Sequence, residues 1–234
     1  MSNDDLDTVS ALAEPTRRGL YDHVVAQHDW VSRDEAAAAL GLRKGITAHH
    51  LDRLEADGLL ISDHQRRNGR TGPGAGRPSK VYRRAAEDFE VSLPPRRYDL
   101  AGRVLSVAAD RARNDGITID DAIDEAARAE GVRVGDGAKQ RAGDDPTPEE
   151  QRAALFHELR ADGFEPVTGD DDVTVLHNCP FHELSATHTE LICGMNHTML
   201  TAAVECCGDT GLEARLEPHA GTCCVRFQRA APTG

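Results

Sequence analysis

The sequence is poor in aromatic residues and in lysine. Phe, Trp and Tyr together make up only 4% of its 234 residues, so a core must be built mainly from Ala, Leu and Val. Three Lys stand against 24 Arg, a bias that fits either a GC-rich genome or a high-salt cytoplasm.

Long apolar segments are missing as well. No run approaches the roughly 18–20 apolar residues that a transmembrane helix needs. The N-terminal stretch MSNDDLDTVSALAEPTRR is acidic and has no signal-peptide pattern. We therefore expect a cytoplasmic protein that does not contact a membrane.

The usual cysteine signals are also absent. No cysteine precedes Cys179, and no C-x-x-C pair occurs, which removes the familiar spacing of zinc ribbons, ferredoxins and thioredoxins. A disulfide framework is not expected in a reducing compartment. The six cysteines are therefore candidates for metal ligands, redox-sensing thiols or small buried residues.

The net charge of −13 is unevenly distributed. Residues 1–84 contain 13 basic and 12 acidic residues, whereas residues 85–234 contain 14 and 28. Residues 61–84 alone hold seven basic residues and one acid, interspersed with Gly and Pro. An acidic protein with one concentrated basic segment predicts a local binding site for a polyanion.

Local signals predict short helices before the basic segment. Ser32-Arg33-Asp34-Glu35 is a capping box that predicts a helix over 34–40, and Gly41 ends this helix. A second helix is predicted over 46–57, followed by a strand from Leu59. Helix, glycine turn, helix and strand is the order of a winged helix-turn-helix.

The basic segment then lies inside a predicted hairpin, because residues 80–83 alternate between polar and apolar side chains. Its glycines allow close approach to a phosphate backbone, and its guanidinium groups can bridge phosphates or enter a minor groove. The alternative is a disordered basic loop without a partner. A nucleotide-binding loop is not expected, since no Lys-Ser/Thr pair follows the glycines.

The helix over 46–57 is the predicted recognition helix, with Ile46, Leu51 and Leu54 facing the core. Its predicted contacts with double-stranded DNA, including the preceding turn, are Arg43, Lys44, Thr47, Ala48, His49 and Arg53. The predicted contacts in the basic segment are Arg66, Arg67, Arg70, Arg77 and Lys80. Any one of these side chains could be merely solvated, so it is the group that predicts a DNA surface.

Four stretches carry a family resemblance. EPTRRGLYDHV, HHLDRLEADGLL and GRTGPGAGRPSKVYRR, followed by SLPPRRYDLAGRVL, resemble winged-helix regulators of the broad ArsR-like class. RTGPGAGRP is more specific, and is similar to the SufR-like repressors of iron–sulfur cluster assembly operons. The resemblance covers nearly the whole chain and implies a DNA-binding regulator, not an enzyme.

Residues 86–148 are predicted to form a helical linker. One helix is expected to start near Asp99 and another after Thr118, while the Gly-, Asp- and Arg-rich residues 131–148 indicate a flexible connection. DNA-reading winged helices usually act as symmetric pairs. The helix from Asp99 is therefore a candidate for homodimerisation, the alternative being simple packing within one chain.

Residues 149–234 predict a small α+β domain. Pro148 begins a helix, residues 173–176 form a strand, ELICGMNHTMLTAAVECC forms a helix, and LEARLEP and CCVRFQ form strands. The apolar line of the long helix is expected to be Leu191, Met195, Met199 and Ala202. The predicted fold class is α+β, divided into a winged helix-turn-helix (1–85), a helical linker or dimerisation segment (86–148) and a cysteine-bearing domain (149–234).

Cysteines on separate elements can converge, and thiolate pockets favour iron–sulfur clusters or zinc. The SufR-like resemblance implies that NCPFHEL, ELICGMN and GTCCV carry cluster ligands, which are Cys179, Cys193 and Cys223. Cys207 is the candidate for the fourth ligand, although an Asn, a His or an external thiol could replace it. The pairs Cys206-Cys207 and Cys223-Cys224 leave the register open, and Cys224 is expected to point away from Cys223 if both lie on a strand.

Several alternatives remain for this domain. Zinc is favoured by the nearby histidines, which are His177, His182, His188, His197 and His219. Metal-free thiol–disulfide sensing, a small-molecule pocket with structural cysteines, and an enzyme that pairs Cys179 with His177 or His182 are the others. The leading prediction is a homodimeric repressor whose operator binding is modulated by an iron–sulfur cluster or by thiol redox state.

Overall fold

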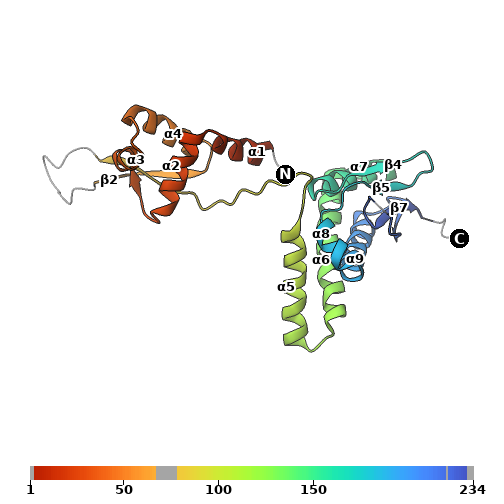
Figure 1. Cartoon of the computed structure of the whole chain (residues 1–234). Coiled ribbons are helices and arrows are strands. Elements are labelled where there is room, and N and C mark those ends of the chain that lie inside the picture. Colours follow the sequence, from red (N-terminus) through yellow and green to blue (C-terminus); the bar gives the residue numbers. More distant parts are fainter. Residues whose placement is uncertain (1–2, 67–77, 220, 231–234) are drawn as a thin grey trace. The chain divides into compact units, whose positions relative to one another are not determined.

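The computed structural model describes residues 3–66, 78–219 and 221–230, with side chains from Leu6 onward. The chain is α+β and forms two compact units, residues 1–91 and 92–234 (Figure 1). Residues 86–148, expected as a separate segment, are thus divided, and most of them pack in the same unit as the C-terminal sheet. Among the helices of the described ranges, none is long and apolar enough to cross a membrane.

The N-terminal unit is mainly helical. Its helices are α1 (Asn3–Ser10), the 3-10 turn η1 (Ala11–Ala13), α2 (Pro15–Ala26), α3 (Arg33–Leu40) and α4 (Lys44–Ala56). The expected capping box is confirmed, because the Ser32 side chain accepts a hydrogen bond from the Glu35 N–H while the Glu35 side chain accepts one from the Ser32 N–H. Gly41 ends α3 in the left-handed region with φ of 64°, where glycine is favoured.

A three-stranded antiparallel sheet completes this unit. Its strands are β1 (Val31–Ser32), β2 (Leu60–Gln65) and β3 (Ser79–Arg84), in the order β1-β3-β2. The β2–β3 hairpin pairs Leu60 with Arg84 and Gln65 with Ser79. Leu20, Leu51 and Tyr82 are fully buried between the helices and the sheet.

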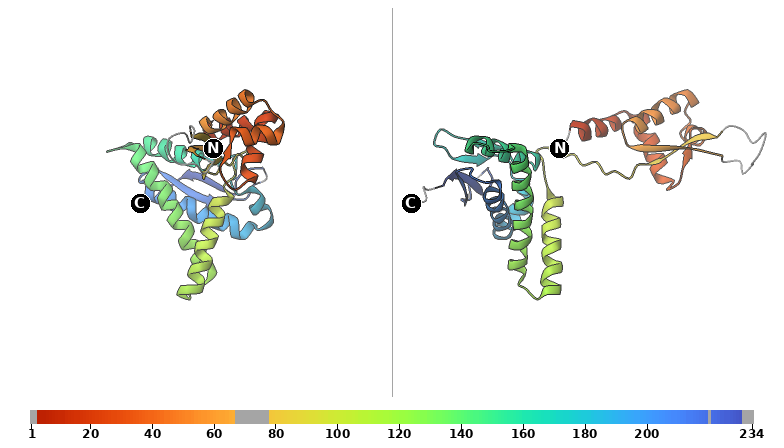
Figure 2. Two further views of the ribbon diagram at one scale, coloured as in Figure 1. Left: turned by 90° about the vertical axis from the view of Figure 1, so that its left-hand side faces the viewer. Right: turned by 180° about the vertical axis from the view of Figure 1, so that it is seen from behind.

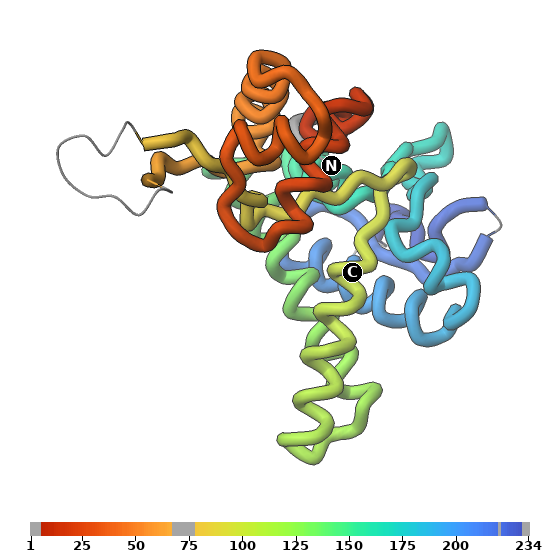
Figure 3. Tube along the Cα trace, turned by 60° about the vertical axis from the view of Figure 1, so that its left-hand side comes forward, coloured from red at the N-terminus to blue at the C-terminus, as the bar shows by residue number. Residues whose placement is uncertain are grey.

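The C-terminal unit contains five helices in the part of the chain that the structure describes. They are α5 (Tyr98–Asp115), α6 (Ile119–Ala142), α7 (Pro148–Ala161), α8 (His182–Thr187) and α9 (Thr189–Cys207). The sequence signals for their starts are confirmed at Thr118, which caps α6, and at Thr147, which forms a capping box at α7. α5 and α6 run antiparallel as a long hairpin (Figures 2 and 3).

The prediction of a flexible connection over 131–148 was wrong for its first part, because α6 extends to Ala142. Its glycines serve helix packing. A Cβ atom at Gly131 would lie 2.1 Å from the Met199 carbonyl oxygen, and one at Gly135 would lie 2.7 Å from that of Ala203. Glycine therefore lets α6 approach α9 at backbone distance, although it costs helix propensity.

A four-stranded antiparallel sheet packs with these helices. Its strands are β4 (Pro166–Thr168), β5 (Thr174–Leu176), β6 (Leu212–Leu216) and β7 (Val225–Arg229), in the order β4-β5-β7-β6. On α9 the buried apolar side chains include Ile192, Met195 and Met199, whereas Leu191 is 40% exposed. The expected apolar line was therefore wrong at Leu191, one helical position from the buried Ile192.

Candidate nucleic-acid interface and thiol site

The buried face of α4 differs from the predicted one. Thr47, Leu51 and Leu54 are fully buried, and their spacing of four and three residues places them on one helical face. Ile46 is instead 44% exposed. The predictions that Ile46 faces the core and that Thr47 contacts DNA were both wrong, since Thr47 donates its hydroxyl hydrogen bond to the Arg43 carbonyl inside the fold.

Ile46 instead belongs to the exposed side of α4. With His49 and Arg53 it forms a stripe at i, i+3 and i+7, and Arg43 and Lys44 lie exposed at the helix start. We call these five residues the α4 face. Ala48, a further predicted contact, is half-buried beside this face. The face combines an apolar side chain with cations near a helix N-terminus, where the backbone N–H groups favour anions.

The cations of the α4 face are held only loosely by acids. Lys44 Nζ lies 2.9 Å from Asp34 Oδ1, with both side chains more than two-thirds exposed. Arg53 Nε lies 2.9 Å from Asp57 Oδ2 within the same helix. Exposed pairs of this kind contribute only about 0–1 kcal/mol, so exchanging the carboxylate for a phosphate costs little.

Lys80, a predicted DNA contact, lies in a different environment. Its ammonium group donates to Asp52 Oδ1 at 2.8 Å and also to Glu55, and the side chain is 22% exposed. Burial lowers the pKa of Lys80, but the hydrogen bonds to these two carboxylates outweigh burial and raise it. We correct the role of Lys80 from a free DNA contact to an internal support that joins β3 to α4.

Asp52 is the centre of this support. Its Oδ1 accepts hydrogen bonds from Arg33 at 2.6 Å and from the Tyr82 hydroxyl at 2.7 Å, in addition to that from Lys80. Burial raises the pKa of Asp52, but the hydrogen bonds from Lys80, Tyr82 and Arg33 prevail and lower it to about 2. Burial and the bond to Asp52 raise the pKa of Tyr82 to about 12. The network fixes the orientation of α4 against α3 and β3.

The β2–β3 hairpin places part of the basic segment. Arg66 is exposed immediately after β2, and the register Gln65–Ser79 puts it where the two strands separate. Arg67, Arg70 and Arg77 lie outside the described residues. The hairpin therefore presents at least one guanidinium group at its end.

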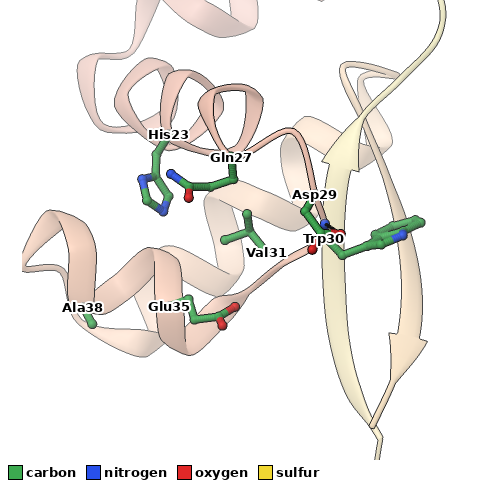
Figure 4. Close-up of a pocket in the computed structure, with 7 residues that line it drawn as sticks. All are labelled: His23, Gln27, Asp29, Trp30, Val31, Glu35 and Ala38. Atoms are coloured by element: carbon green, nitrogen blue, oxygen red, sulfur yellow. Dashed lines mark hydrogen bonds between the residues drawn. The ribbon is translucent and has the colours of Figure 1, made fainter. Parts of the chain in front are cut away.

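An open pocket of about 470 Å³ lies between α2 and α3. Figure 4 shows His23, Gln27 and Glu35 around it, with the ring of Trp30 directed away from them. Glu35 is engaged in the capping box, and Asp29 accepts a hydrogen bond from the Trp30 N–H at 2.7 Å. Both carboxylates are thus used by the local backbone, and we do not include this pocket in the proposed site.

In the C-terminal unit, four cysteines come from three separate segments. Cys179 follows β5, Cys193 lies in the second turn of α9, and Cys223 and Cys224 directly precede β7. All four are buried. The Cys223 N–H donates to the Leu176 carbonyl at 2.8 Å, which brings the end of β5 and the start of β7 together.

The thiols of these four residues, which we call the thiol cluster, interact with one another. A hydrogen bond with Cys223, together with burial, raises the pKa of Cys179. Cys179 lowers the pKa of Cys223 through the same contact, but a hydrogen bond with Cys224 and burial raise it to about 12. Burial raises the pKa of Cys193 against a smaller opposite effect of Cys224. The free thiols are thus protonated at neutral pH.

The predicted ligand set needs two corrections. Cys193 and Cys207 lie on the continuous helix α9, 14 residues apart, so a rise of 1.5 Å per residue separates them by about 21 Å. Cys207 instead donates to the Gln151 carbonyl at 3.6 Å. Cys224 joins the thiol cluster because it precedes β7, so the alternation of strand side chains does not apply to it.

Asn196 is a member of this site that the predicted ligand set did not include. Its side chain is 1% exposed, and Nδ2 donates to Cys223 Sγ at 3.2 Å. Its Oδ1 is buried without a hydrogen-bond partner. An amide donor to sulfur favours the thiolate form, and the spacing of three residues from Cys193 places Asn196 on the same side of α9.

Comparison with protein families, with curated proteins and with solved structures gave no match. The chemistry of the residues themselves therefore carries the functional argument.

The thiol cluster fits a metal group by donor type but is not arranged around one. Thiolates are the ligands preferred by iron–sulfur clusters and zinc, and the unpartnered Asn196 Oδ1 leaves one buried acceptor unused. Within the described ranges, no three His, Cys, Asp or Glu side chains form a group ready to hold a metal ion. Binding would require release of thiol protons and a small rearrangement of the loops.

The histidines named for the zinc and enzyme alternatives lie apart from the thiol cluster in their contacts. His177, His182, His188 and His219 are exposed. His197 Nε2 lies 3.2 Å from the Ala214 carbonyl oxygen. Cys179 interacts with Cys223, the Phe181 N–H and Ser185, and its raised pKa disfavours the thiolate that a nucleophile requires.

Proposed function

We propose that this chain is a DNA-binding transcriptional regulator of the winged helix-turn-helix type, acting as a cytoplasmic homodimeric repressor. The α4 face carries this proposal, because its exposed cations and one apolar side chain project from a helix that internal ion pairs hold rigidly. The β2–β3 hairpin beside it supplies the element that a wing requires.

In this proposal the residues of α4 divide the work. Arg43 and Lys44 neutralise phosphates at the helix start, where the N-terminal dipole adds to their charge. Ile46 contacts a thymine methyl group, and Arg53 reads a guanine edge in the major groove. Arg66 at the hairpin end contacts the backbone or the adjacent minor groove. The pairing of two chains places two α4 helices on two half-sites.

We further propose that the thiol cluster modulates DNA binding by holding an iron–sulfur cluster, with zinc or thiol oxidation as the alternatives. Cys179, Cys193, Cys223 and Cys224 would hold the group, and Asn196 would donate to the Cys223 sulfur. When bound, an iron–sulfur cluster would supply a redox-dependent charge. The buried thiols provide soft donors, and the Asn196 amide stabilises negative charge on one of them.

The test of DNA binding starts from a random duplex library, from which the full chain selects its operator. We expect Arg53→Ala to weaken binding to the selected duplex by roughly 5–150-fold, because one bidentate base contact is worth about 1–3 kcal/mol. Arg128→Ala, which removes an exposed Arg–Glu205 pair in the other unit, is the matched control. Equal affinities for both variants, or failure to select any duplex, would contradict the proposal.

The test of the thiol cluster is anaerobic purification followed by visible absorption with iron, sulfide and zinc assays on the same sample. We expect matched iron and sulfide that Cys193→Ser removes and Cys207→Ser does not. A colourless protein with stoichiometric zinc would replace the iron–sulfur cluster by the zinc alternative. Retention of full metal content in Cys193→Ser would contradict the proposed site.

A further inference from the structure

The segment that joins the two units is bound to the Cys179 loop. Residues 92–97 begin the C-terminal unit and lead into α5, as the trace in Figure 3 shows. The Arg97 N–H donates to the Pro180 carbonyl at 3.0 Å. One Nη1 of Arg96 donates to Asn178 Oδ1 at 2.5 Å and to the Cys179 carbonyl at 3.3 Å. Three successive residues around Cys179 thus hold two successive residues of the joining segment.

Asn178 closes this connection from the other side. Its side chain is 6% exposed, and Nδ2 donates to the Pro95 carbonyl at 2.9 Å and to the Gly163 carbonyl at 2.6 Å. Both ends of the amide are therefore used, one by the joining segment and one by Arg96. The contact is specific, because every donor in it meets a defined acceptor.

The acceptors of Arg96 differ from those of its neighbour. Arg97 pairs with the carboxylates of Asp99 and Asp162, which raise its pKa. The acceptors described for Arg96 are neutral oxygens of Pro95, Asn178 and Cys179. Because its guanidinium contacts the carbonyl of Cys179 itself, negative charge that develops on this thiolate strengthens the attraction for Arg96.

We propose that Arg96 is a positioning residue that transmits the state of the thiol cluster to the joining segment, and hence to the N-terminal unit. This inference deepens the proposed function and rests on it for the effect on DNA. A displaced Cys179 loop pulls directly on residues 95–97. Pro94 and Pro95 have fixed φ angles, so the adjoining backbone absorbs little of that displacement.

The experiment compares the full chain in its reduced, metal-free form with the form reconstituted anaerobically with ferrous iron and sulfide, or with Zn²⁺ alone. Hydrogen exchange of the Arg97 amide reports on the bond to Pro180, and the affinity for the selected duplex reports on function. The variants are Arg96→Ala and Arg96→Lys. Arg103→Ala is the matched control, since this α5 arginine pairs with Glu130 away from the Cys179 loop.

We expect the Arg97 amide of the wild-type chain to exchange at least about tenfold more slowly in one form than in the other, the factor expected for loss of one charged hydrogen bond. The duplex dissociation constants of the two forms should differ at least about fivefold. In Arg96→Ala both ratios should fall below about 2 at unchanged metal content, with Arg96→Lys partly restoring them and Arg103→Ala resembling the wild type.

The outcomes separate the inference from the proposed function. Unchanged Arg97 exchange in the wild-type chain under both treatments overturns the inference, as does a wild-type duplex ratio in Arg96→Ala. If Arg97 exchange responds and depends on Arg96 while duplex affinity stays constant, the inferred link stands and the proposed control of DNA binding fails.

Discussion

Asp52 shows how one residue determines the presentation of a whole helix. Its carboxylate binds a guanidinium from α3, an ammonium from β3 and a tyrosine hydroxyl, so three elements meet at one side chain. The cost of burying these charges is met only while all partners are present. Loss of the carboxylate would leave Arg33 and Lys80 near each other without compensation.

We predict that Asp52→Asn lowers the free energy of unfolding by about 1–2 kcal/mol at neutral pH, a value kept small because the side chain is 45% exposed. The pKa of Asp52 is lowered from 3.8 to about 2 in the folded chain. Its contribution is therefore fully present above about pH 4 and is lost as the pH falls towards 2.

Chemical unfolding of the wild type and of Asp52→Asn between pH 2 and 6 measures this dependence. Asp34→Asn serves as control, because its pair with Lys44 is highly exposed. A difference between wild type and Asp52→Asn that stays constant down to pH 2 would contradict the assigned role.

At the scale of elements, α4 separates stability from binding on its two faces. Ile46 is 44% exposed, whereas Leu51 is fully buried one turn further along. We predict that Ile46→Ala weakens binding to the selected duplex by roughly 5–30-fold with unfolding changed by less than about 0.5 kcal/mol. Leu51→Ala should instead destabilise by about 2–5 kcal/mol. Fluorescence anisotropy and thermal unfolding measure the two effects, and strong destabilisation by Ile46→Ala would refute the assignment of faces.

The packing of α6 on α9 gives a second prediction at this scale. Gly135→Ala would place a Cβ atom 2.7 Å from the Ala203 carbonyl oxygen, so the helices must separate, at a cost of about 1–3 kcal/mol. Gly102→Ala is the matched control, since nothing lies within 4 Å of its added Cβ atom on α5. This control should gain about 0.5–1 kcal/mol from helix propensity. Equal effects of the two changes in urea unfolding would contradict close packing by Gly135.

The same elements show which features the sequence predicts and which it does not. The starts of α3 and α7 follow from Ser32 and Thr147, because a cap is made by residues within one turn. Gly131 and Gly135 were instead interpreted as flexible, because the partner that requires glycine lies about 70 residues later in α9. A distant contact is absent from local spacing.

The candidate sites follow the same rule. Arg43, Lys44, His49 and Arg53 were predicted from the helix pattern and are exposed as expected. Thr47 was misplaced, because Ile46 and Thr47 are adjacent and a shift of about 100° exchanges their environments. Cys207 was misassigned because equal spacing along the sequence ignores that α9 continues without a break from Cys193.

At the scale of the whole molecule, charge sets the conditions for the proposed function. The net charge is −13, and residues 85–234 carry twice as many acids as bases. An acidic chain is repelled by DNA at long range, so binding depends on the few cations that lie close to the phosphates. Each cation displaces condensed counterions from the duplex, which makes affinity fall steeply with salt.

We predict that Lys44→Ala reduces the slope of log affinity against log salt by about 1, because this residue contacts phosphate in the proposed complex. Arg53→Ala should instead relax base preference at one position of the operator with a smaller change of overall salt slope. Anisotropy titrations from about 50 to 200 mM salt on the selected duplex and on single-base variants distinguish the two. Arg128→Ala, in the acidic C-terminal unit, should leave both the slope and the base preference unchanged. A slope that is the same in all three variants would show that the α4 face does not lie against the phosphates, and the repulsion of the acidic unit would then leave the chain without a site for duplex DNA among the residues that the structure describes.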